Sequence, residues 1–283
     1  MTPRADVLAK VHSILARAGI HNPSRDALAI VASASRLSDM ANQAMCALAM
    51  AAERAAGTPL AHVTGSVHFM DIELMASPGV LVPREETELL GRTAVHVLNT
   101  MTIAGELRAI DMCCGSGNLA CGIASHHPAV RVWASDLSGD AVRVATANVR
   151  KLGLSDRVEA VQSDLFEALG GRGLEGTIDL IVCNPPYISS TKLERDRAEL
   201  LVHEPRTAFD GGPYGVRIFQ RVVREAATFL RPGGTLLFEI GEGQERQVAL
   251  LFERSGCYEP AFAIKDSEGC PRVMAGQKQC TSA

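Results

Sequence analysis

The chain has 283 residues, 47% of them hydrophobic and 21% charged, which is enough for one large domain or two unequal ones with a proper core. Its 28 Lys and Arg and 32 Asp and Glu give a formal charge of -4, so no global field draws it to nucleic acid or anionic lipid. The longest nearly uncharged stretch, residues 40–52, is too short to span a bilayer, and the N-terminus carries no signal-peptide core. We therefore expect a cytoplasmic, globular protein that binds no membrane.

Eight cysteines are scattered along the chain, and the close set of Cys113, Cys114 and Cys121 has spacings that match no zinc pattern. Reduced thiols and no metal site are expected.

The first part of the chain has only helical signals. Apolar residues recur every three to four positions from Val7 to Ala18, and Gly19 predicts the end of that helix. Ser24 with Asp26 can cap a second helix, and a third is expected from about Ser38 to Ala56. These helices predict a small Ala-rich bundle.

The pattern changes at Thr58. Residues 62–76 have the β-branched and aromatic content of a hairpin, and residues 78–90 lead into a helix. We predict three parts, which are an N-terminal helical substrate-recognition domain at 1–57, a hairpin and helix connector at 58–104, and a catalytic domain at 105–283.

Strands alternate with helices from residue 105 onward. The expected strands are 107–113, 130–136, 158–164, 178–183 and 235–241, the last after the turn Pro232-Gly233-Gly234. This alternation predicts right-handed crossovers and a parallel doubly wound α/β sheet, whose ligands bind beyond the carboxyl ends of the strands.

A stiff turn, Asn184-Pro185-Pro186-Tyr187, follows the apolar strand at 178–183. Prolines fix φ and have no N–H to donate, so the carbonyls of Asn184 and Pro185 are left to accept hydrogen bonds from an NH2 group. An ordinary strand-ending turn is the structural alternative.

Other strand ends carry a nucleoside-binding pattern. Gly115 and Gly117 lie in a turn after Asp111, where the main chain can approach a ligand. Asp136 can accept both hydroxyls of a ribose or cap a helix, and Asp164 can take an adenine amino group or serve as a turn residue. Ala120 replaces the third glycine of a dinucleotide fingerprint, which does not exclude NAD, but the pattern as a whole fits S-adenosylmethionine better.

The residues resemble the release-factor glutamine methyltransferases, the HemK/PrmC family, over nearly the whole chain. The likeness rests on GTPLAHVTGSVHF with PGVLVPREETELL, VCNPPYIS, HEPRTAFDGGPYG, FEIGEGQ and KDSEGCPRVMAG. NPPY alone is shared with DNA and RNA amino-methyltransferases, whereas the flanking segments are more specific. The resemblance implies a class I S-adenosylmethionine-dependent methyltransferase fold, Rossmann-like, with a small N-terminal helical domain. It also implies N5-methylation of the Gln in the GGQ motif of peptide chain release factors.

The resemblance assigns site residues by position. The cofactor residues would be Asp111, Cys113, Cys114, Gly115, Ser116, Gly117, Asp136, Leu137, Asp164, Leu165 and Asn184. The catalytic turn would be Asn184, Pro185, Pro186 and Tyr187, with Tyr187 packed against the planar amide. By analogy, substrate contacts would come from Arg84, Glu86, Asn184, Pro185, Tyr187, Glu204 and Arg206.

The chain departs from the family pattern at Cys113, where the usual turn has Gly. Either φ is negative at Cys113 or the turn is altered. Glu85 replaces a proline of the usual PRPETE segment, and Leu165 stands where an aromatic residue often flanks adenine. These departures indicate a divergent member, whose acceptor can differ.

Three alternatives stay open. A DNA or RNA adenine methyltransferase would need a basic groove and a target-recognition region, neither of which is evident. A specialised methyltransferase of a small molecule or another protein would keep the cofactor site and change the helical domain. A non-catalytic binding module is disfavoured by the intact turn at Asn184.

Overall fold

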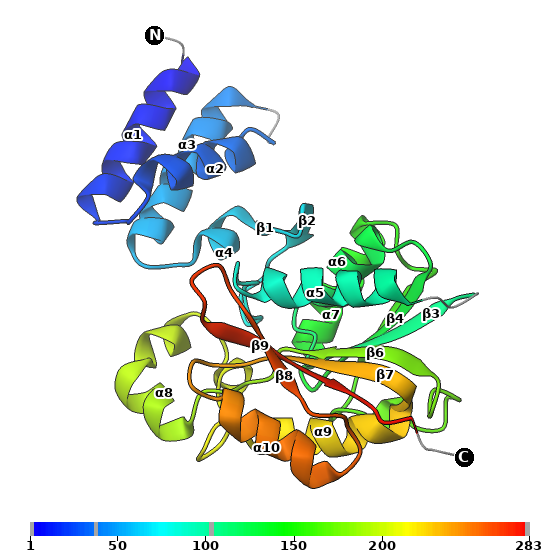
Figure 1. Ribbon diagram of the computed structural model, residues 1–283. Helices are drawn as coiled ribbons and strands as arrows, with labels where there is room; N and C mark the ends of the chain where they lie inside the picture. Colours follow the sequence, from blue (N-terminus) through cyan, green and yellow to red (C-terminus); the bar gives the residue numbers. More distant parts are fainter. Residues whose placement is uncertain (1–2, 37–38, 102–104, 281–283) are drawn as a thin grey trace. The chain divides into compact units, whose positions relative to one another are not determined.

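A computed structural model describes residues 3–36, 39–101 and 105–280, and the chain divides into two compact units (Figure 1). The first unit comprises Met1–Val67 and Ala76–Pro78, and the second comprises His68–Met75 and Gly79–Ala283. No helix in the described ranges is both long and apolar enough to cross a membrane.

The first unit is a helical bundle of α1 (Pro3–Arg17), α2 (Pro23–Ala34), α3 (Met40–Ala55) and α4 (Leu60–Thr64). The predicted cap of α2 was wrong, because the Asn22 side chain accepts from Arg25 N at 3.1 Å and Pro23 takes the first helical position. Asp26 is instead buried and pairs with Arg54 of α3 at 2.8 Å. The predicted start of the third helix at Ser38 lies outside the described residues.

Strands β1 (Ser66–Phe69) and β2 (Ile72–Met75) form the expected hairpin, although residues 62–64 belong to α4 rather than to a strand. Met70 and Asp71 both have positive φ, as a two-residue hairpin turn requires. Within the second unit, Met70 N donates to Glu88 Oε1 at 2.9 Å. The Met70 side chain fills the space that Gly91 of α5 (Thr87–Thr100) and Gly122 of α6 (Asn118–His126) leave open.

The described part of the second unit contains a seven-stranded sheet in the order β5-β4-β3-β6-β7-β9-β8. Its strands are β3 (Leu107–Met112), β4 (Val130–Asp136), β5 (Val158–Gln162), β6 (Ile178–Cys183), β7 (Leu230–Glu239), β8 (Phe262–Lys265) and β9 (Pro271–Gln277). Strands β3 to β7 pair in parallel, as predicted. Asp111 and Asp136 therefore reach the same edge as Asn184.

Two details of the sheet differ from the prediction. Strand β9 is antiparallel to both β7 and β8, because the short turn between β8 and β9 joins them as a hairpin rather than through a crossover helix. Strand β7 begins at Leu230, so the residues predicted as a turn, Pro232-Gly233-Gly234, lie within the strand. The pairing of β7 with β6 is irregular there, with a register shift between Ile178 and Leu180.

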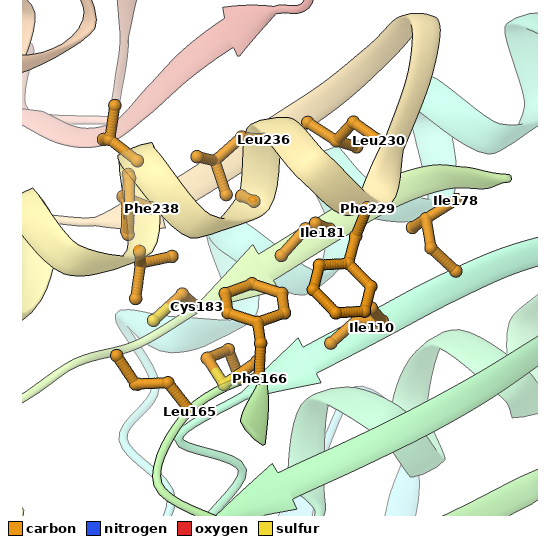
Figure 2. Packing of buried hydrophobic residues seen from close by; sticks show 14 of the residues in the cluster. Ile110, Leu165, Phe166, Ile178, Ile181, Cys183, Phe229, Leu230, Leu236 and Phe238 are labelled. Atoms are coloured by element: carbon orange, nitrogen blue, oxygen red, sulfur yellow. The ribbon is translucent and has the colours of Figure 1, made fainter. Parts of the chain in front are cut away.

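Helices cover both faces of this sheet (Figure 1). Helices α5, α6 and α7 (Gly139–Lys151) lie on one face, and α9 (Arg217–Phe229) and α10 (Glu245–Ser255) lie on the other. Under α9 the core is apolar and aromatic, with the Phe166 and Phe229 rings stacked 4.8 Å apart (Figure 2). Shorter elements are η1 (Glu167–Leu169), α8 (Ser190–Asp196), η2 (Ala198–Val202) and η3 (Arg206–Ala208).

Candidate active site

A cavity of about 380 Å³ opens at the carboxyl edge of the sheet, and a second cavity of about 610 Å³ adjoins it. Both volumes are within the range of small-molecule sites. Leu81, Asn184 and Ala208 line both cavities. Asn184 therefore stands where a molecule in one cavity meets a molecule in the other.

The turn after β3 forms part of the first cavity. Asp111 is fully buried at the strand end, where its Oδ2 accepts from Ala120 N at 2.9 Å and its Oδ1 has no partner in the described chain. Cys113 and Gly115 line the cavity, whereas Cys114 and Ser116 are buried behind it. Gly117 has a φ of 75° and begins α6, and a Cβ there would lie only 3.0 Å from Ala145 Cβ.

Cys113 has a φ of 60°, so the left-handed turn is kept without glycine. The expectation of a negative φ at Cys113 was wrong. Hydrogen bonds from Cys114 N to Ser135 O at 3.0 Å and from Gly115 N to Asp136 Oδ2 at 2.9 Å hold the turn against the end of β4, which offsets the strain of a left-handed residue that has a Cβ.

Asp136 ends β4 and lines the same cavity. Its Oδ2 accepts from Gly115 N and its Oδ1 from Ser138 N, each at 2.9 Å. A carboxylate has about four acceptor sites, so Asp136 retains capacity to accept from ribose hydroxyls. Leu137 follows and exposes 64% of its surface at the cavity.

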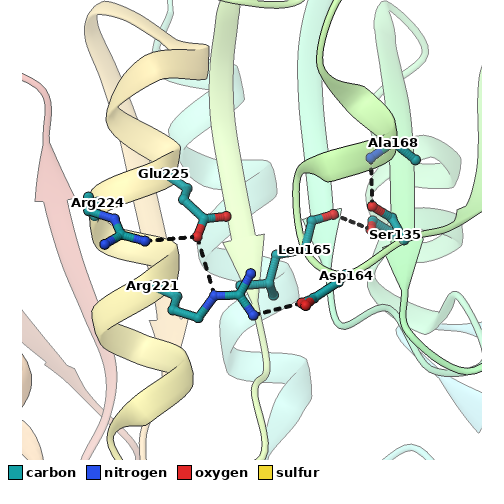
Figure 3. Close-up of polar contacts among 8 residues, drawn as sticks. Ser135, Asp164, Leu165, Ala168, Arg221, Arg224 and Glu225 are labelled. Atoms are coloured by element: carbon teal, nitrogen blue, oxygen red, sulfur yellow. Dashed lines mark hydrogen bonds and ion pairs between the residues drawn. The ribbon is translucent and has the colours of Figure 1, made fainter.

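Asp164 also lines the first cavity and forms an ion pair with Arg221 of α9, with 2.7 Å between Oδ1 and Nη1 (Figure 3). Leu165 has a φ of 52°, and its carbonyl accepts from Ser135 Oγ at 2.8 Å. This bond holds the Leu165 side chain at the cavity wall.

Burial raises the pKa of both carboxyl groups near this turn. Desolvation raises the pKa of Asp111 to about 8, and the nearby Asp136 adds to the effect. Desolvation also raises the pKa of Asp136, although main-chain N–H groups partly offset it. A cationic ligand would stabilise both carboxylates.

These residues fit S-adenosylmethionine. Its cationic groups match the acidic character of this turn, where the buried Asp111 has an unpartnered Oδ1 and the partly exposed Asp136 lines the cavity. Asp136 and Asp164 both line a cavity of suitable volume.

The Asn184 turn separates the two cavities. Pro186 lines the first, whereas Pro185 and Tyr187 line the second. Asn184 Nδ2 donates to Thr87 Oγ1 of α5 at 3.2 Å, which leaves its Oδ1 to act as an acceptor.

The loop at 209–215 packs against this turn at main-chain distance. A Cβ on Gly211 would lie 2.6 Å from Pro186 O, and one on Gly215 would lie 2.3 Å from Tyr187 O. Gln244 adds a hydrogen bond of 3.0 Å to Tyr187 O. The two glycines thus allow the loop to lock the turn in place.

Of the four charged residues expected to contact the substrate, two line the second cavity and two do not line either cavity. Arg84 and Glu86 line the second cavity. Glu204 is buried and is bonded to Val82 N and to Arg84, at 2.9 and 2.5 Å, and Arg206 pairs with Asp210 and Glu194. The structure therefore places Glu204 behind Arg84, and neither Glu204 nor Arg206 is among the residues that line the two cavities.

Sequence reasoning missed Thr87 and Glu239. Glu239 ends β7 and lines the second cavity, although it is 95% buried, and its Oε1 accepts from the Tyr187 hydroxyl at 3.4 Å. Desolvation raises the pKa of Glu239 to about 6. Asp136 was identified as an acidic residue at the carboxyl end of a predicted strand, and Glu239 meets the same criterion. The sequence around Thr87 contains no pattern that predicts a role in the site.

All eight cysteines are free thiols. Within the described ranges, no group of three or more His, Cys, Asp or Glu side chains is placed to hold a metal ion.

The mixed sheet with its parallel strands β3 to β7, the strand-end carboxylates and the Asn184 turn define a methyltransferase of the class I, Rossmann-like fold. The methyltransferase small domain family model matches residues 92–213. Solved structures with this fold include a methyltransferase from Pyrococcus furiosus, with a TM-score of 0.51, 18% identity and coverage of 73% of this chain and 89% of that one. The 16S rRNA N2 G1207 methyltransferase of T. Thermophilus, in complex with AdoMet and guanosine, has a TM-score of 0.54 and 21% identity over 76% and 50% of the two chains.

Curated relatives are closer in sequence. The release factor glutamine methyltransferase of Moorella thermoacetica is 38% identical over 80% of this chain and 77% of its own. That of Gloeobacter violaceus is 35% identical over 76% and 73%. The chain belongs to the release factor glutamine methyltransferase family.

Proposed function

We propose that this protein transfers a methyl group from S-adenosylmethionine to the side-chain amide nitrogen of the glutamine in the GGQ motif of a peptide chain release factor. The observation that carries the proposal is the position of Asn184 on both cavities, with its amide nitrogen engaged by Thr87 and its oxygen left to accept. The relatives are named release factor glutamine methyltransferases, which supports a release factor as the methyl acceptor.

The first cavity would hold the cofactor, which supplies an electrophilic methyl group on a sulfonium sulfur. Asp136 would accept the ribose hydroxyls, and Asp164, held by Arg221, would accept the adenine amino group. The buried Asp111 would lose its proton when cationic charge arrives beside it.

The second cavity would hold the glutamine. An amide nitrogen is a poor nucleophile because its lone pair is delocalised into the carbonyl, so positioning must supply the rate. If Asn184 Oδ1 and the Pro185 carbonyl accept the two amide N–H bonds, the lone pair turns toward the first cavity. The same two dipoles stabilise positive charge that develops on nitrogen. Tyr187 would pack against the planar amide.

The acceptor itself is tested by methyl transfer from tritiated S-adenosylmethionine to a purified release factor, a GGQ peptide, DNA and a cell extract. We expect label in the release factor and none in a variant whose motif glutamine is replaced by alanine. Label only in DNA or in a small molecule would overturn the proposal.

The role of Asn184 is tested with Asn184→Ala. Removing one preorganised acceptor is expected to lower kcat by about 10² to 10³ fold, with a much smaller change in cofactor affinity. Methylation at a near wild-type rate would mean that the turn is structural.

We also propose that the N-terminal helical unit selects the acceptor, because its helices contribute nothing to the cofactor pattern. A chain that begins near Thr58 and still folds should bind the cofactor but not methylate the release factor. Full activity of such a truncation would refute this role.

A further inference from the structure

The orientation of the Asn184 amide decides whether the site presents an acceptor or a donor. Asn184 Nδ2 donates to Thr87 Oγ1 at 3.2 Å. A hydroxyl can both donate and accept, so Thr87 by itself does not select one of the two amide orientations. Another group must fix the direction of the Thr87 proton.

Glu239 is the candidate for the group that fixes the direction of the Thr87 proton. Thr87 is 1% exposed and Glu239 is 5% exposed. Glu239 Oε2 is buried without a hydrogen-bond partner in the described chain, while Oε1 accepts at 3.4 Å from the hydroxyl of Tyr187, three residues after Asn184. The Thr87 side chain acts to lower the pKa of the same carboxyl group. An ionised carboxylate only accepts, so it draws the Thr87 proton toward itself.

We propose that Glu239 is a positioning residue that fixes, through the Thr87 hydroxyl, the orientation in which Asn184 presents its Oδ1 to the substrate amide. The proposal rests on the proposed function. With its proton directed at Glu239, Thr87 offers Asn184 only a lone pair, and Asn184 must turn its NH2 to Thr87. The relay joins α5, the turn after β6 and the end of β7.

Protonation of Glu239 removes the constraint. A neutral carboxyl can donate to Thr87, and the Thr87 hydroxyl can then donate to Asn184 Oδ1, which allows the reversed amide. The groups that face Glu239 are Thr87 and Glu86 from α5, Tyr187 from the turn and Arg272 from β9. Burial and Glu86 raise the pKa of Glu239 to about 6, against the opposing effects of Thr87, Tyr187 and Arg272. The active orientation is therefore lost as the pH falls through about 6.

The kinetic test compares four variants across pH. Glu239→Gln and Thr87→Val are expected to lower kcat by about 10 to 100 fold at neutral pH, with little change in cofactor affinity by calorimetry. Thr87→Ser keeps the hydroxyl and should retain most of the activity. Glu253→Gln makes the same charge change on an exposed side chain of α10 and is the matched control. Wild type and Glu253→Gln should lose kcat below about pH 6, whereas Glu239→Gln should show no such loss.

A second readout needs no catalysis. In protein labelled with ¹⁵N-asparagine, the side-chain amide resonance of Asn184, assigned by its absence in Asn184→Ala, should titrate near pH 6 in wild type and not in Glu239→Gln. An amide that does not titrate in wild type, or a pH profile unchanged by Glu239→Gln, overturns the relay. If wild type methylates no acceptor but the resonance titrates, the proposed function fails and the relay stands.

Discussion

Asp136 Oδ2 accepts a hydrogen bond from the main-chain N–H of Gly115, 21 residues earlier in the chain, at 2.9 Å. The carboxylate at the end of β4 thus orders the turn after β3 and also faces the proposed cofactor cavity. Cofactor affinity and turn geometry should depend on the same side chain.

Asp136→Ala is expected to weaken S-adenosylmethionine binding by about 1.5 to 3 kcal/mol, because it removes charge-assisted hydrogen bonds to the ribose. Isothermal calorimetry measures the change. Asp140→Ala, at an exposed position in the first turn of α7, is the matched control and should bind normally. Equal affinity in Asp136→Ala and wild type would remove Asp136 from the site.

Arg221→Met should weaken cofactor binding by about 3 to 10 fold, because Asp164 loses the ion pair that holds it at the cavity wall. Arg224→Met is the control, since Arg224 is on the same helix and contacts Glu225 instead (Figure 3). Calorimetry on both variants decides the point. Equal cofactor affinity in Arg221→Met and Arg224→Met would show that Asp164 does not need the ion pair with Arg221.

Cys113→Gly should unfold at a higher urea concentration than Cys113→Ala. Both lose the sulfur, but alanine keeps the Cβ that is strained at a φ of 60°, and the difference should be about 1 kcal/mol. Urea unfolding followed by circular dichroism gives the two midpoints. Alanine as stable as glycine would mean that the turn carries no strain.

The buried Asp111 should make the free energy of unfolding fall as pH rises. Its pKa is raised from 3.8 to about 8 by desolvation, so the native state holds a proton that the unfolded state has released between these values. The contribution of this proton to the free energy of unfolding is fully present below about pH 4. It decreases between about pH 4 and pH 8, by up to about 1.4 kcal/mol per pH unit, and is lost once the pH has risen through about 8.

Asp111→Asn cannot titrate, so its stability should vary less with pH over this range. Urea unfolding at several pH values, with and without S-adenosylmethionine, measures both slopes. Identical slopes for variant and wild type would show that Asp111 is already ionised in the native state.

Local pattern was sufficient to predict helices α1 to α3 of the first unit, the strands β3 to β6 and the polar residues at their ends, but not the short helix α4. Alternation of strands with helices forces parallel pairing, and parallel pairing brings Asp111, Asp136 and Asn184 to one edge. These features depend on hydrophobic periodicity and on the order of strands and helices, both of which can be read from the sequence. The family segments around NPPY extended this prediction to the kind of chemistry.

Tertiary structure decided what the residues at that edge do to one another. Thr87 and Asn184 are 97 positions apart, and only the packing of α5 against β6 and β7 brings the hydroxyl to the amide. The raised pKa of Glu239 follows from burial, and the turn that begins at Cys113, where φ is 60°, is held by hydrogen bonds to the end of β4. Hydrogen-bond direction, desolvation and backbone strain all depend on neighbours that are distant in the chain, so the linear pattern does not contain them.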